Sequence, residues 1–66
     1  MKLRDFTVPE LNKFRALCNF TDDELYYFNM KAKDKSHTEI ALRMNVSEAQ
    51  VAKLSKRVRN KIIKVI

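Results

Sequence analysis

Hydrophobic residues in this chain recur every three or four positions within four separate stretches, at about 8–18, 22–33, 37–44 and from 48 almost to the end. This spacing places them on one face of an α-helix. A half-buried strand would instead need polar and apolar residues to alternate, and no stretch of the sequence does so. The pattern therefore predicts an all-α fold of four helices, with a short third helix and a long C-terminal helix.

Each predicted helix opens with a capping pattern. In a capping box, Ser or Thr is followed three residues later by Glu or Gln, and each side chain bonds a backbone N–H that the first turn leaves without a partner. Pro9 lies in the first turn of the first helix, where its missing N–H is not needed. The four pairs are Thr7 with Glu10, Thr21 with Glu24, Ser36 with Glu39, and Ser47 with Gln50.

The apolar face of each helix predicts the hydrophobic core. We expect Tyr27 to lie away from this face, either solvated or covered by the first helix, and Ile63 to point away from the core. The expected core residues are Val8, Leu11, Phe14 and Cys18 in the first helix, Leu25, Tyr26, Phe28, Met30 and Ala32 in the second, Ile40, Ala41 and Met44 in the third, and Val51, Leu54, Val58, Ile62 and Val65 in the fourth.

A very short connection joins the third helix to the fourth. Only Asn45, Val46 and Ser47 separate them. Helices that share a core across three residues must cross sharply, as they do in a helix-turn-helix. We expect Asn45 to be left-handed, because asparagine tolerates that conformation best after glycine. Ala41 would let the two helices approach closely, and Val46 would fill the corner.

Positive charge is concentrated in the C-terminal part of the chain. The net charge is +6, but residues 1–24 carry four basic and five acidic side chains, whereas residues 25–66 carry ten basic and three acidic. Such asymmetry indicates a polyanionic partner, either nucleic acid or an anionic membrane surface. With 45% hydrophobic and 33% charged residues, the composition is otherwise typical of a soluble globular protein.

Groups that could perform chemistry are scarce. Cys18 and His37 are the only residues of their types. A single cysteine cannot form an internal disulfide or a multi-cysteine metal site, and a single histidine without ligating partners does not suit metal or hydrolytic catalysis. We therefore expect no enzymatic activity, no cofactor, no metal and no small-molecule substrate. The sequence holds neither an apolar run of about 18 residues nor a signal peptide, which favours a cytoplasmic protein without a membrane span.

The segment FTDDELYYFNMKAKDKSHTEIALRMNVSEAQVAKLSKRVRNKI, residues 20–62, resembles the four-helix helix-turn-helix domains of LuxR/GerE-type regulators and the related region-four domains of sigma factors. Glycine usually stands in those domains where this chain has Asp34 and Asn45. A length of 66 residues predicts a single domain over 1–66, of which the resemblance covers 20–62 and residues 1–19 add one N-terminal helix. The matching pieces are Thr21 and Glu24, Lys35 and Ser36, EIA at 39–41, and NVSEAQV at 45–51.

In such domains the helix after the turn enters the major groove of DNA by its N-terminal half, and the preceding helix crosses the phosphate backbone. Capping alone is the alternative role for Ser36, and a solvated position without a role is the alternative for His37. The resemblance implies base-reading residues Glu48, Ala49, Gln50, Ala52, Lys53 and Lys56, and phosphate-binding residues Ser36, His37, Thr38, Arg43, Arg57, Arg59 and Lys61.

Three functions are compatible with the sequence. The first is sequence-specific binding of double-stranded DNA by a small transcriptional regulator or a stand-alone sigma-region-four-like protein. The second is a helix-turn-helix module that contacts RNA polymerase or another regulator without reading DNA. The third, and least favoured, treats residues 48–66 as a basic amphipathic helix for membrane surfaces. Ile63 and Ile66 fall outside the core stripe, so either they pack on the N-terminal helix or they meet a second copy of the chain. Of the two, a homodimer through the C-terminal helix is favoured.

Overall fold

The computed structural model describes residues 3–66, apart from the side chain of Arg4. It consists of the short 3-10 helix η1 (Leu3–Asp5) and the α-helices α1 (Val8–Leu17), α2 (Asp22–Ala32), α3 (His37–Met44) and α4 (Glu48–Val65). No strand occurs among these residues, so the predicted all-α fold with a short third and a long fourth helix is confirmed.

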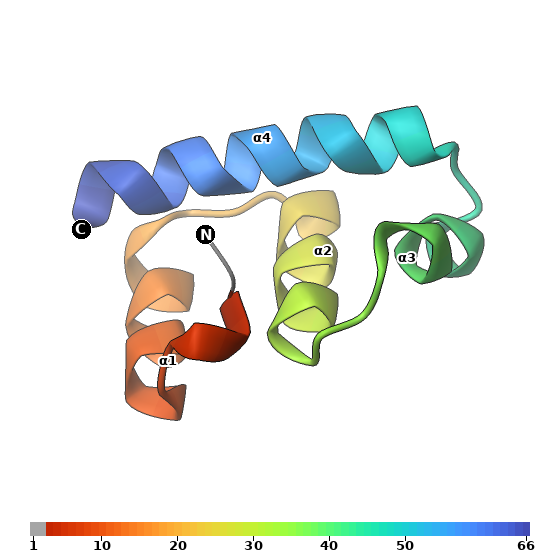
Figure 1. The fold of residues 1–66 in the computed structure, drawn as a ribbon. Coiled ribbons are helices and arrows are strands. Elements are labelled where there is room, and N and C mark those ends of the chain that lie inside the picture. Colours follow the sequence, from red (N-terminus) through yellow and green to blue (C-terminus); the bar gives the residue numbers. More distant parts are fainter. Residues whose placement is uncertain (1–2) are drawn as a thin grey trace.

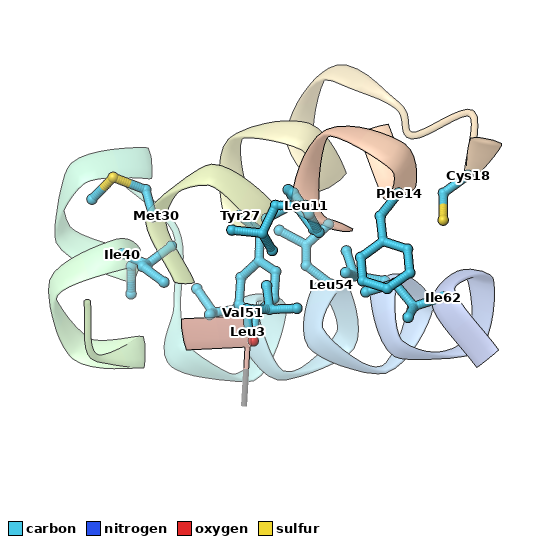
Figure 2. Packing of buried hydrophobic residues seen from close by; sticks show 13 residues of the cluster. Leu3, Leu11, Phe14, Cys18, Tyr27, Met30, Ile40, Val51, Leu54 and Ile62 are labelled. Atoms are coloured by element: carbon cyan, nitrogen blue, oxygen red, sulfur yellow. The ribbon is translucent and has the colours of Figure 1, made fainter. Parts of the chain in front are cut away.

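The longest helix, α4, organises the packing. It contacts α1, α2 and α3, which follow one another along its length (Figure 1). Figure 2 shows the buried side chains extending from Cys18 and Ile62 at one end of the molecule to Ile40 and Met30 at the other. The full set of buried hydrophobic residues is Leu3, Leu11, Phe14, Cys18, Tyr27, Phe28, Met30, Ile40, Ala41, Val51, Leu54, Val58 and Ile62.

The backbone of the corner between α3 and α4 is built as the sequence predicts, but Val46 is 38% exposed and does not fill the corner as expected. Asn45 has φ 57° and ψ 45°, which is the left-handed conformation. The N–H of Val46 donates to the carbonyl of Ala41 at 3.0 Å, and the N–H of Asn45 donates to that of Leu42 at 3.3 Å. These two bonds form a Schellman motif, which ends a helix by satisfying its last carbonyls.

The same device ends α2. Asp34 has φ 63°, the N–H of Lys35 donates to the carbonyl of Met30 at 3.1 Å, and the N–H of Asp34 donates to that of Lys31 at 2.9 Å. Asn19, just after α1, is also left-handed with φ 50°, a conformation that was not predicted from the sequence. Three helices in a chain without glycine are thus each followed by Asn or Asp in a left-handed conformation.

Two of the four predicted capping boxes are complete. At Thr7 and at Thr21 the side chain accepts from the N–H of the third helical residue, whose carboxylate accepts from the threonine N–H in return. Ser36 and Ser47 accept from the N–H groups three residues later, at 3.1 and 3.2 Å. Glu39 instead accepts from Arg43, so the box at Ser36 is half formed.

Two predictions about the core were wrong. Tyr27 is 4% exposed and Tyr26 is 39% exposed, the reverse of what the apolar stripe of α2 predicts. The reason is η1, which brings Leu3 beside Tyr27 and covers a face of α2 that the periodicity leaves to solvent. Val8 is 68% exposed rather than buried, and the preceding Phe6 packs edge-on against Phe14 with ring centroids 5.0 Å apart.

One buried ion pair joins the far half of α4 to the start of α2. The Glu24 carboxylate is buried and accepts from the Lys61 ammonium and, at 3.0 Å, from the N–H of Thr21. Lys61 also donates to the carbonyl of Asn19 at 3.2 Å and lies 6.0 Å from the centre of the Phe20 ring. Burial raises the pKa of Glu24, but the hydrogen bonds from Lys61 and Thr21 outweigh this, so its net pKa is lowered from 4.5.

This ion pair predicts a pH-dependent loss of stability in Glu24→Gln. A carboxylate whose folded pKa is lowered stabilises the fold above its unfolded pKa, and this contribution disappears as the pH falls through the folded pKa. Because Lys61 is 31% exposed, we expect a loss of about 2 kcal/mol at pH 7, between the values for exposed and buried pairs. Urea unfolding of wild type and variant should show the difference shrinking below pH 4.5, the ordinary value for this carboxyl.

The matched control is Glu10→Gln, which alters the equivalent residue of the exposed capping box at Thr7 and should have a smaller effect. Lys61→Met should destabilise the fold at pH 7 because it leaves a buried carboxylate without its cation. The double variant should lose less free energy of unfolding than the sum of the losses in the two single variants. Equal losses of unfolding free energy in Glu24→Gln and Glu10→Gln would contradict a special contribution of the Glu24–Lys61 ion pair to stability.

Candidate nucleic-acid interface

The outward face of α4 carries the predicted base-reading residues. Successive helical residues are about 100° apart, so Ala49, Ala52, Lys53 and Lys56 fall within a sector of about 100° on the side opposite the buried Val51. Glu48 and Gln50 lie on opposite edges of that sector. All six side chains are exposed, so α4 can present them together to a partner.

Glu48 is also bonded to α3. The Thr38 hydroxyl donates to its carboxylate at 3.0 Å. This bond links the first turns of the two helices on the exposed side of the corner. Thr38 and Glu48 therefore already have one partner each. Lys53 and Lys56 form no hydrogen bond or ion pair with the described part of the chain and can reach outward.

Two grooves flank the outward face of α4. The groove on the α2 side is lined by Asp23, Met44, Val46, Gln50, Lys53, Leu54 and Arg57. The groove on the α3 side is lined by His37, Ala52, Ser55, Lys56, Arg59 and Asn60. Arg57 and Arg59 are two residues apart, hence about 200° around the helix, and accordingly line different grooves. The predicted phosphate-binding residues do not form one cluster but are divided between the two sides.

His37 stands where α2, α3 and α4 meet. Its Nε2 lies 3.1 Å from the Tyr27 hydroxyl, and the two rings meet edge to face with centroids 5.7 Å apart. Burial and the nearby Lys31 ammonium lower the pKa of His37, and Glu48 opposes them. Burial also raises the pKa of Tyr27. His37 is therefore a half-buried, neutral side chain in contact with α2 at near-neutral pH, rather than a freely solvated one.

Lys61 does not share this surface. Its ammonium is directed toward Glu24 and the carbonyl of Asn19, so we leave it out of the phosphate-binding set. Arg43 is exposed and donates to Glu39 at 3.2 Å, an exposed pair of the kind that contributes about 0–1 kcal/mol and is readily exchanged for another partner. Ser36 caps α3, as its alternative role required.

Ser55 and Asn60 are not among the site residues predicted from the sequence, although both line the groove on the α3 side. On the helix they lie at the two sides of Arg59 and Lys56, and their small polar side chains carry no charge signal. Only the position of α3 shows that they share a groove with His37. No feature of local sequence could have identified them.

The apolar side of α4 is not available to a membrane surface, because Val51, Leu54, Val58 and Ile62 are buried in the core. Within residues 3–66, no helix is both long and apolar enough to cross a membrane. Comparison of the chain with protein-family models, with curated proteins and with solved structures gives no match. What can bind at α4 therefore follows from the exposure and charge of its own side chains.

Proposed function

We propose that this chain binds double-stranded DNA in a sequence-specific manner, with the N-terminal half of α4 in the major groove. The observation that carries the proposal is the exposed sector of α4 with Ala49, Ala52, Lys53 and Lys56. Small side chains let the helix approach the base edges closely, and lysine donates well to guanine O6 and N7. Gln50, at the edge of the sector, suits adenine.

The charge of α4 supports the same proposal. Residues 49–66 contain six basic and no acidic side chains. Arg57 and Arg59 leave the helix on opposite sides, so they can contact the phosphates of the two strands that border a major groove. His37, Thr38 and Arg43 of α3 add candidate phosphate contacts on one side. A cytoplasmic regulator of transcription, or a sigma-like protein acting at promoters, is the role that this chemistry suits.

A second candidate is a protein-interaction module that contacts RNA polymerase or another regulator. The observation that favours it is Leu42, which is 77% exposed on the outer side of α3. Selection of bound sequences from a random pool of duplexes separates the two candidates. A recovered consensus supports DNA reading, and a palindrome would indicate two copies of the chain per site. Failure to enrich any sequence would favour the protein module.

Affinity for DNA should fall steeply with salt. If four to six phosphates are contacted, the slope of log affinity against log salt should be about −4 to −5, because each neutralised phosphate releases a condensed counterion. Fluorescence anisotropy with a labelled duplex across a salt series measures this slope. A flat response would remove the electrostatic basis of the proposal.

Lys53 and Arg57 should behave differently although both line the α2-side groove. Lys53→Ala is expected to weaken binding to the selected site by about tenfold or more while changing binding to random DNA less, because a base contact discriminates by about 1–3 kcal/mol. Arg57→Ala should weaken binding to both DNAs alike. Equal losses on both duplexes for Lys53→Ala would refute its assignment as a base reader.

A second copy of the chain is the partner we propose for the end of α4, where Ile63 and Ile66 are exposed. Burying them between two copies would add apolar area to a domain that is small for a stable core. Sedimentation at micromolar concentration should show a dimer, and Ile63→Lys should shift it to monomer. A monomer for the wild type would contradict this expectation.

A further inference from the structure

The α3-side groove gathers groups that recognise an oxyanion. Lys56 and Arg59 bring two cations from α4, and Ser55 and Asn60 add neutral donors beside them. His37 enters from α3 at the opposite wall. Lysine and arginine side chains together with hydroxyl and amide donors are what proteins commonly use to hold phosphate.

Several titratable or charged groups surround His37. From α2 come the Tyr27 hydroxyl, 3.1 Å from Nε2, and the Lys31 ammonium. From α4 come Glu48, which is bonded to Thr38, and the cations Lys56 and Arg59 that line the same groove. Burial and Lys31 lower the pKa of His37, so its neutral form predominates near neutral pH in the free protein.

We propose that this groove binds one phosphate group. Lys56, which then contacts phosphate rather than a base edge, and Arg59 are its permanent cations, and His37 joins them by taking up a proton when the phosphate arrives. The inference rests on the proposed DNA binding, which supplies the phosphate as part of the backbone. It adds that a proton is bound together with the DNA.

The proton uptake follows from charge. A phosphate in the groove places a negative charge near the imidazole, and an opposite charge at about 4–6 Å raises the pKa of such a group by about 1–3 units. In the protonated ring both nitrogens are donors. Nε2–H then donates to the Tyr27 oxygen and Nδ1–H can donate to another acceptor, which is one N–H donor more than the neutral ring carries. The Tyr27 contact thus fixes the ring in both states.

The affinity for DNA changes with pH in a defined direction. If binding raises the pKa of His37, the complex holds more protons than the free protein, so affinity increases as the pH falls through the range between the two pKa values. A rise of one unit corresponds to a gain of up to about tenfold in affinity. The interval from pH 8 to pH 6 stays above the range in which Glu24 titrates.

The experiment has two arms and uses the whole chain. In the first, inorganic phosphate is added at fixed pH while the NMR signals of the His37 ring are followed, with chloride at equal ionic strength as the reference. The wild type and Arg57→Gln, whose altered charge lies in the other groove, should respond to phosphate. Arg59→Gln and Lys56→Gln should respond weakly or not at all.

In the second arm, affinity for a short duplex is measured at several pH values at constant ionic strength. The wild type should bind up to about tenfold more tightly at pH 6 than at pH 8, and His37→Gln should lose this dependence while remaining folded by thermal unfolding. Because Arg59 is exposed, Arg59→Gln provides a readout even if His37→Gln is unstable.

The outcomes separate this inference from the proposed function. An equal phosphate response in Arg59→Gln and wild type, or an unchanged pH dependence in His37→Gln, would overturn the groove assignment while DNA binding stands. No binding of any duplex at low salt would refute DNA binding, and the phosphate arm alone would then decide whether the groove holds an oxyanion.

Discussion

The ion pair between Lys61 and Glu24 ties the far half of α4 to the start of α2, and together with the buried Val51, Leu54, Val58 and Ile62 it holds the helix on which the rest of the molecule packs. A carboxylate that is buried at the start of α2 needs a cation, and the only one that reaches it among the described residues comes from the far half of α4. The same ammonium also holds the carbonyl of Asn19, so the turn between α1 and α2 is tied to α4 as well. With its C-terminal half held in this way, α4 is left with the outer face of its N-terminal half exposed.

The elements of the fold could be predicted from sequence because their signals are local. Thr7, Thr21, Ser36 and Ser47 each cap the helix that follows them, and Asn45 ends α3 in the conformation expected of it. The rotation of α2 could not be predicted, because it is set by contacts distant in sequence. Leu3 from η1 covers Tyr27, and a three-residue helix has no periodicity that would reveal it.

The candidate site shows the same division. Which residues of α4 point outward follows from helix geometry, and the exposure of Ala49, Lys53 and Lys56 agrees with it. Which groups each basic residue contacts cannot be predicted from helix geometry. Charge alone does not distinguish Lys61, whose ammonium is directed inward to Glu24, from Arg59, which lines a groove. Ser55 and Asn60 acquire a place in that groove only through the position of α3. Sequence predicted the face of the helix, and the tertiary packing decides which of its edges can hold an anion.

The left-handed residues after α1, α2 and α3 bear on the entropy of binding. Glycine at those positions would leave the turns free to adopt many backbone conformations. Asn19, Asp34 and Asn45 have fewer accessible backbone conformations than glycine, both in the unfolded chain and in the folded protein. The corner at Asn45 is also held by both bonds of its Schellman motif. α3 and α4 should therefore meet a partner as a single preorganised unit, so that little of the interaction energy is spent on ordering the protein.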